Sequence, residues 1–338
     1  MPLHATTGRW KIGLALALTT AVLWGVLPIA LSVVLRGLDP YTLTWYRFAT
    51  SGLLLGIILA AVNGLPAMGS LGRHEWLLLG VALAGLTGNY VLYVTALSHT
   101  SPIIAQTVTQ LGPMFLLFGG LVLFKERFSG LQWIGFGVLT AGLALLFNGR
   151  LPELIQPSVG LGLGVALLLA GALVWAAYGL AQKRLLSWLG PQQILLLLYL
   201  GAVLLLLPWT APGTVRHLST VQLSMLGFCC INTLVAYGAF AEGLKHWEVS
   251  RFGAVLSTSP LFTVASMWIV HRLAPDLVAP ERLNMLSMAG TLLVVGGSAT
   301  CAHAEQPAAR ADHPHRLDAA VLLRAAARRT PALAIGRP

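Results

Sequence analysis

The chain has 338 residues, of which 57% are hydrophobic and only 9% are charged, and its formal net charge is +10. Because a water-soluble domain normally carries about a quarter charged residues, this composition indicates a polytopic membrane protein. The basic residues form no face with interleaved aromatic residues, so nucleic acid is not an expected partner. The three cysteines lie in apolar runs and imply neither a disulfide framework nor a zinc site. We expect no metal and no cofactor.

Ten apolar runs along the chain approach the roughly 20 residues that a helix needs to cross a bilayer core. The predicted fold class is therefore all-α, a polytopic membrane protein with ten transmembrane helices. Residues 1–11 are expected to form a cytoplasmic N-terminus, and residues 303–338 a disordered, basic cytoplasmic tail. In chain order the predicted spans are 12–35, 41–62, 76–97, 101–124, 131–147, 158–182, 191–209, 221–243, 249–271 and 283–302.

The distribution of lysine and arginine between the loops predicts the orientation in the membrane. A cytoplasmic N-terminus puts nine basic loop residues inside and five outside, before the basic tail is counted. Arg73 then lies inside, whereas Arg150 and Arg216 lie outside. With ten spans, both termini are expected in the cytoplasm.

One skeleton occurs twice in the chain. Trp24 stands sixteen residues before Pro40, and Trp175 stands sixteen residues before Pro191. Further along, Tyr90 recurs as Tyr237 at an offset of 147 residues, as do several other positions. Residues 12–148 and 158–302 are thus predicted to be two five-helix repeats. Because five is odd, the second repeat is expected upside down in the membrane, as in many secondary transporters.

A proline lies near the middle of the fourth span and another at the equivalent depth of the ninth. Pro113 and Pro260 each remove a backbone hydrogen bond and should kink their helices. An unsatisfied carbonyl in hydrocarbon costs several kcal/mol, so this backbone should face protein or a water-filled cavity. An ordinary proline kink is the alternative. We favour a central cavity because the two prolines occupy equivalent positions.

Polar side chains near these prolines are candidates to line that cavity. Gln106 and Gln110 lie on the same helix face as the first proline. Their counterparts in the second half, Gly253 and Ser257, form a small-residue face. The two glutamines either contact substrate or bond neighbouring helices, and both interpretations stay open. The same choice between cavity wall and core packing applies to the remaining candidates, which are Trp24, Asn89, Tyr90, Trp175, Asn232 and Tyr237.

Arg47 is the only strongly charged residue well inside a predicted span, and such charges are functional candidates. It can bind a substrate carboxylate, snorkel to the headgroups or make a structural hydrogen bond, and we favour the last two roles. No Asp or Glu occupies the centre of a span. Proton-coupled export of cations commonly uses a membrane-embedded carboxylate, for which Glu242 is the nearest candidate.

The pattern of these residues resembles the drug/metabolite transporter superfamily, specifically its EamA-like branch. The matching residues are Trp24-Gly25, Pro40, Tyr46-Arg47-Phe48, Pro113, Lys125-Glu126, Gly135 and Gly142, then Trp175, Pro191, Pro260, Gly290 and Gly297. The resemblance implies ten helices, cytoplasmic termini and a cavity between the halves, lined in part by the fourth and ninth helices. The second half departs from the pattern at Leu273 and at Leu197-Leu198-Tyr199.

These observations predict a secondary transporter of the inner membrane, without enzymatic activity, whose partners are a small-molecule substrate and the lipid bilayer. The resemblance implies a small polar metabolite, an amino acid or related compound, moved outward by alternating access. A multidrug or cationic-compound exporter is the alternative, disfavoured by the missing central carboxylate. A lipid-modifying membrane enzyme is less favoured, because no His, Asp or Glu cluster lies near one interface.

Overall fold

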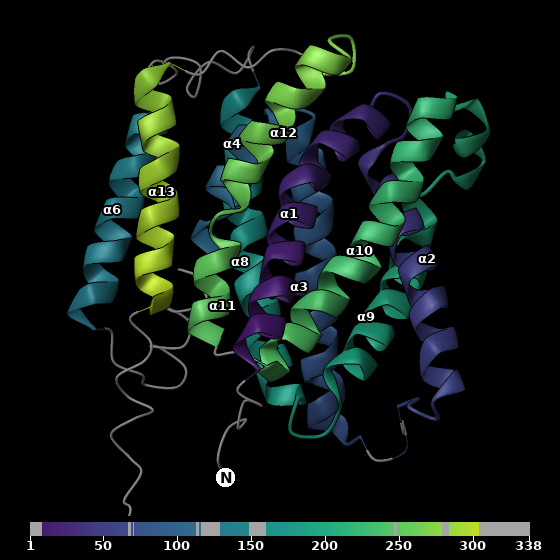
Figure 1. The fold of residues 1–338 in the computed structure, drawn as a ribbon. Coiled ribbons are helices and arrows are strands. Elements are labelled where there is room, and N and C mark those ends of the chain that lie inside the picture. The colour runs from purple at the N-terminus through teal and green to yellow at the C-terminus, as the bar shows by residue number, and fades with distance from the viewer. Residues whose placement is uncertain are drawn as a thin grey trace, which may run out of the picture. The chain divides into compact units, whose positions relative to one another are not determined.

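The computed structural model describes residues 9–66, 69, 71–112, 115, 129–148, 160–246, 249–278 and 284–303. These residues form helices, and no β-strand occurs among them. Two short 3₁₀ helices, Leu207–Trp209 and Pro212–His217, follow the α-helix Pro191–Leu206. The α-helices (Figure 1) are α1 (Trp10–Val34), α2 (Pro40–Ala61), α3 (Arg73–Leu97), α4 (Pro102–Val108), α6 (Gly130–Leu146), α8 (Leu161–Leu185), α9 (Pro191–Leu206), α10 (Thr220–His246), α11 (Val249–Leu256), α12 (Ser259–Leu273) and α13 (Met285–His303).

The helices confirm a polytopic, all-α membrane protein. Six of them, namely α1, α2, α3, α8, α9 with the turn after it, and α10, are long and apolar enough to cross a membrane. Two shorter apolar helices, α6 and most of α13, lie within the fifth and tenth predicted spans. The tail after residue 303 lies outside the described residues.

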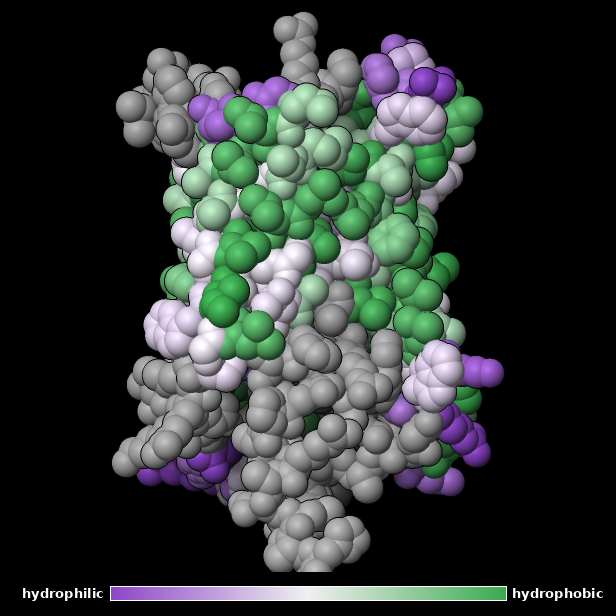
Figure 2. Space-filling view, turned by 60° about the vertical axis from the view of Figure 1, so that its left-hand side comes forward, coloured by the Kyte–Doolittle hydropathy of each residue, from purple (hydrophilic) through white to green (hydrophobic). Residues whose placement is uncertain are grey.

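The apolar surface agrees with this assignment. On the face drawn in Figure 2, hydrophobic residues cover the middle and hydrophilic ones gather toward its two ends. Large apolar side chains are exposed on the surface of several helices, with Leu53 63% exposed and Leu204 72% exposed. In water such surface would favour association, whereas in a bilayer it contacts lipid tails.

Local sequence fixes where α2 begins, and so the depth of its arginine. Asp39 is the N-cap, and one of its carboxylate oxygens accepts hydrogen bonds from the backbone N–H groups of Tyr41 and Thr42, both at 2.9 Å. Pro40 follows as the first helical residue, where its missing N–H leaves no bond unmade. Arg47 therefore stands seven residues, about two turns, inside the helix.

The ninth predicted span is not one helix, which corrects the prediction of a single kinked helix. It breaks into α11 and α12 at Ser257 and Thr258, with Pro260 in the first turn of α12. The carbonyl of Leu256, freed by the break, accepts a hydrogen bond from the Ser259 hydroxyl at 2.6 Å. Because this bond replaces the lost helical one, the chain tolerates a complete break inside an apolar segment.

The first helix of the fourth predicted span, α4, ends at a position equivalent to the break in the ninth span. Helix α4 ends at Val108, and adding the repeat offset of 147 gives position 255, one residue before the end of α11. A turn follows α4, in which the N–H of Gly112 donates to the carbonyl of Thr109 at 2.9 Å. Pro113 itself lies outside the described residues.

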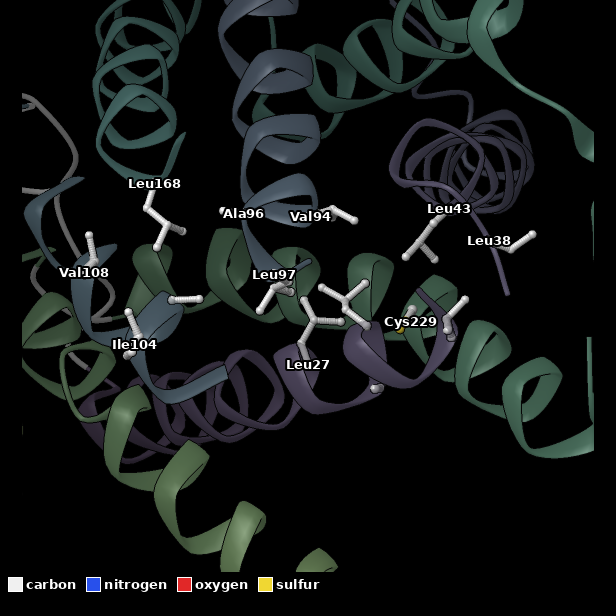
Figure 3. Packing of buried hydrophobic residues seen from close by; sticks show 14 of the residues in the cluster. Leu27, Leu38, Leu43, Val94, Ala96, Leu97, Ile104, Val108, Leu168 and Cys229 are labelled. Atoms are coloured by element: carbon white, nitrogen blue, oxygen red, sulfur yellow. The ribbon is translucent and has the colours of Figure 1, made fainter. Parts of the chain in front are cut away.

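Buried apolar residues from seven of the described helices pack together inside the bundle, and Figure 3 shows part of this cluster. Leu27 of α1, Leu43 of α2, Leu97 of α3, Ile104 of α4 and Leu168 of α8 belong to this cluster, together with residues of α10. The cluster draws on both halves of the sequence, so the halves pack against each other rather than forming separate domains.

The helix contacts follow a regular scheme. We number α1, α2, α3, α4 and α6 as helices one to five of the first half. Their counterparts are α8, α9, α10, the α11–α12 pair and α13. Contacts join α1 to α10 and α3 to α8, and exchanging the halves turns the first pair into the second. The pairs α2–α9, α4–α12 and α6–α13 also contact, and the exchange leaves each unchanged.

Glycines bring two of these pairs together along antiparallel axes. Gly142 lies against Gly290, and Gly135 lies against Gly297, so residue numbers rise along α6 as they fall along α13. In α2 and α9, Gly52 faces Tyr199 while Gly56 faces Leu196, which is again antiparallel. Small residues serve this purpose in membranes, where helix association depends on close packing rather than on the hydrophobic effect.

Candidate functional site

Arg47 is buried at the interface between the two halves. The residue is only 3% exposed, and its side-chain Nε donates a hydrogen bond to the Thr233 hydroxyl of α10 at 3.0 Å. The guanidinium carbon lies 4.6 Å from the centre of the Tyr90 ring, in cation–π contact. Of the two roles favoured for this side chain, the structural hydrogen bond is therefore the one observed, and snorkelling is not.

No carboxylate neutralises Arg47 within the described part of the chain. The acidic residues described there lie elsewhere: Asp39 caps α2, Glu75 lies in the first turn of α3, and Asp276 lies in the loop after α12. Glu242, which sequence analysis picked as the nearest acid, pairs with His246 at 3.4 Å near the end of α10. The described partners of the guanidinium are thus a hydroxyl and an aromatic face.

A continuous set of aromatic rings extends from Tyr90, the ring that this arginine contacts. Tyr90 packs against Phe48 at 4.6 Å between ring centroids and against Tyr237 at 6.2 Å. Tyr237 in turn contacts Trp24 at 5.5 Å. Three predicted site residues, Trp24, Tyr90 and Tyr237, therefore come together with Arg47 although they lie on three different helices.

Two of these ring contacts join residues that are equivalent in the repeat. Tyr90 and Tyr237 are 147 residues apart, and Phe48 stacks on Tyr199, 151 residues further on, at 5.5 Å. Equivalent residues touch where a symmetry axis passes between them, so this cluster lies at the junction of the halves. Sequence analysis missed Phe48 and Tyr199 as site residues. Their shared place after the Trp–Pro skeleton was the available signal.

Several buried polar atoms near this cluster have no hydrogen-bond partner in the described structure. They include the hydroxyl of Tyr199 and the side-chain oxygen of Asn232. The ring of Phe48 stacks on Tyr199 and also packs against Tyr90, the ring that Arg47 contacts. Buried polar groups are normally paired, so unpaired ones indicate a place where water or a ligand binds.

The two candidate asparagines both link the halves. The side-chain amide of Asn89 donates to the carbonyl of Gly171 at 3.0 Å, and that of Asn232 donates to the carbonyl of Leu23 at 2.8 Å. The packing role considered for them is thus observed. Asn232 differs in that its oxygen is left unpaired.

The two candidate glutamines hydrogen-bond to helices other than their own. The Tyr93 hydroxyl donates to the side-chain oxygen of Gln106 at 3.2 Å, and the Ser298 hydroxyl approaches that of Gln110 at 3.4 Å. Both glutamines are 8% exposed. The interhelical bonding role is therefore present in this state. The Tyr93 hydroxyl thus joins α3 to α4.

The remaining candidates lie along the broken fourth and ninth spans. Ser257 and Pro260 are buried at the α11–α12 break. The ring of Trp175 packs against the backbone of Gly112 after α4, 3.2 Å from where a Cβ would stand. No group of three or more potential metal ligands occurs among the residues the structure describes.

Comparison with known proteins agrees with this architecture. The EamA-like transporter family matches residues 11–148 and 162–301. The chain is 39% identical over 288 residues to the uncharacterized inner membrane transporter YhbE of Escherichia coli (strain K12), covering 85% of this chain and 90% of that protein. It is 25% identical over 298 residues to a probable amino-acid metabolite efflux pump of the same organism, covering 83% and 92%.

A solved crystal structure shares the fold, with a TM-score of 0.60 over 86% of this chain and 96% of that one, at 22% identity. The resemblance predicted from the Trp, Pro and Gly pattern is thereby confirmed. Together with the helical fold, the match over both halves establishes that the chain belongs to the EamA-like transporter family.

Proposed function

We propose that this chain is a ten-helix secondary transporter of the inner membrane, built from two inverted repeats. Its substrate is a small polar metabolite, an amino acid or related compound, moved outward by alternating access. The antiparallel packing of equivalent helices around one buried polar and aromatic cluster carries the proposal. In an inverted-repeat transporter, rocking of one repeat against the other opens a site at their junction to each side in turn.

Three further features support the proposal. The broken fourth and ninth spans resemble the discontinuous helices that form transporter sites, where irregular backbone lines a cavity. The excess of lysine and arginine in alternate loops supports cytoplasmic termini. One relative is described as a probable amino-acid metabolite efflux pump. A cationic substrate is the weaker candidate, because the fixed charge at the centre of the described site is the positive charge of Arg47.

Counterflow in proteoliposomes tests this function. Vesicles containing the purified protein are preloaded with one of a panel of unlabelled amino acids, nucleosides, sugars or quaternary amines. Uptake of the same labelled compound is then followed with and without a pH gradient. We expect preloading to stimulate uptake of at least one amino acid, because an alternating-access carrier returns faster when loaded.

Protein-free vesicles are the control for leakage. Stimulated uptake of quaternary amines alone would favour the cationic-compound exporter instead. Stimulated uptake of no compound in the panel would contradict the proposal. A signal that does not depend on preloading would point to a channel rather than a carrier.

A further inference from the structure

We infer that Arg47 binds a carboxylate of the transported compound, and that the Thr233 hydroxyl occupies the arginine in the state described here. This inference rests on the proposed transport function and assigns the residues that recognise the substrate's charged group. The ligand it specifies is a small carboxylate that also carries an N–H or ammonium donor.

The electrostatic situation of Arg47 is the first support. A buried guanidinium loses its hydration, and the loss is offset only when paired charges or several hydrogen bonds replace the water. Here the described partners are one neutral hydroxyl and one ring face. A charged ligand supplies the missing counter-charge, and intramembrane charges of this kind mark substrate paths by default.

The geometry leaves one edge of the guanidinium for such a ligand. Thr233 engages Nε, and the Tyr90 ring covers one face at 4.6 Å. No described hydrogen bond uses the two terminal nitrogens. Two parallel N–H groups on one edge match the two oxygens of a carboxylate, which guanidinium groups bind in a bidentate manner.

The Thr233 hydroxyl is suited to hold the arginine and to release it. It donates its proton to the carbonyl of Cys229 at 2.8 Å, one turn back along α10, and so accepts from Arg47 through a lone pair. The bond between Arg47 and Thr233 joins α2 of the first half to α10 of the second. A neutral hydroxyl accepts one hydrogen bond and carries no counter-charge. A carboxylate supplies a negative charge and two acceptor oxygens for bidentate binding, so it competes effectively with the threonine.

The unpaired polar atoms complete the specification. The hydroxyl of Tyr199 can donate to a carboxylate beside the guanidinium. The unpaired oxygen of Asn232, the residue next to Thr233, can only accept, so it selects a ligand with an N–H group. The rings of Trp24 and Tyr237 provide apolar surface for the rest of the compound.

Ligand-induced thermal stabilisation of the purified protein in neutral detergent tests the inference. Three matched panels are compared: L-amino acids, the corresponding acids without the amino group, and the corresponding amines without the carboxylate. We expect stabilisation by members of the amino-acid panel, weaker stabilisation by the acids and none by the amines. No anionic lipid is added, so that a lipid headgroup does not occupy Arg47 in place of the test compound.

Variants assign the effect to Arg47. Arg47→Gln should lose the stabilisation, whereas Arg47→Lys should keep the preference for carboxylates with affinity reduced about tenfold or more, because an ammonium lacks the bidentate edge. Thr233→Val should bind at least as tightly as the unmodified protein. Arg36→Gln is the matched control. Arg36 donates to the backbone carbonyls of Asp276 and Leu277 near the end of α1, and its replacement should leave the affinity unchanged.

The outcomes separate the inference from the proposed function. If ligands stabilise Arg47→Gln as much as the unmodified protein, or if amines alone stabilise the unmodified protein, the carboxylate site is overturned. The proposed transport function would still stand if counterflow of another solute were observed. If Arg47→Gln does not fold, the panel comparison on the unmodified protein and on Arg47→Lys still decides. Stabilisation by no carboxylate compound would also overturn the inference.

Discussion

Replacing Gly290 with leucine is expected to abolish accumulation of folded protein. A Cβ at Gly290 would lie 2.5 Å from the backbone nitrogen of Leu146 and 2.6 Å from the carbonyl oxygen of Gly142. These are backbone atoms of α6, which cannot move aside as a side chain can. Adding methylenes to a packed core costs about 1–3 kcal/mol, and separating two helices costs more. The loss is thus a large part of a typical total stability of about 5–15 kcal/mol.

The adjacent region of the same helix provides the matched control. Gly296 has no atom within 4 Å of the position its Cβ would take. Gly296→Leu should therefore accumulate normally, since leucine is favoured over glycine in a helix by somewhat less than about 1 kcal/mol. Both variants are compared by fluorescence-detected size-exclusion chromatography of solubilised membranes. A monodisperse peak of normal height for Gly290→Leu would contradict the close α6–α13 contact.

Replacing Asn232 with leucine is expected to reduce counterflow at least about tenfold while leaving the amount of folded protein nearly unchanged. The side chain makes one hydrogen bond between the halves, to the carbonyl of Leu23. Bonds of this kind in membranes contribute on average only about 0.6 kcal/mol, so packing alone predicts a small effect. A large effect on flux requires the unpaired oxygen of Asn232 to act on the substrate.

Asn89 is the control for this variant, because its amide also bonds a carbonyl of the other half, at Gly171. Its oxygen is not among the buried unpaired atoms of the described structure. Asn89→Leu should therefore retain most of the flux. Equal losses in the two variants, or parallel losses of folded protein, would assign Asn232 to packing.

The sequence predicted the helical framework well because apolar length and proline position act locally. Each predicted span contains one described α-helix, except the ninth, which contains both α11 and α12. Pro260 predicted a disturbance at the correct depth. It did not predict a full break, because the Ser259 hydroxyl that caps the freed carbonyl acts through side-chain geometry.

The presence of glycine at position 25, where the repeat counterpart is Ala176, is also explained only by the three-dimensional structure. A Cβ at Gly25 would meet the Cβ of Phe262 at 2.6 Å and the carbonyl oxygen of Ser259 at 2.8 Å, where α12 begins against α1. The sequence aligns the two residues but gives no reason for the missing methyl group. The contact that excludes it crosses more than 230 residues of chain.

The candidate site was predicted as a set of residues, and not as an arrangement. Trp24, Arg47, Tyr90 and Tyr237 were chosen for their depth and their repeat positions, and they come together. The partner of Arg47 was not predicted, because Thr233 lies 186 residues away on a helix whose rotation the sequence does not set. The sequence left open whether Arg47 snorkels or makes a structural hydrogen bond, for the same reason.

The inverted relation of the two halves underlies the site, its symmetry and the proposed transport cycle, and one pair of cysteines tests it. His74 and Val221 are exposed repeat counterparts at the starts of α3 and α10. Each is replaced by cysteine in a protein lacking Cys229, Cys230 and Cys301, and then labelled with a membrane-impermeant maleimide. In intact spheroplasts we expect labelling at position 221 only, and in inverted vesicles at position 74 only. Labelling of both positions from the same side would contradict the inverted repeat.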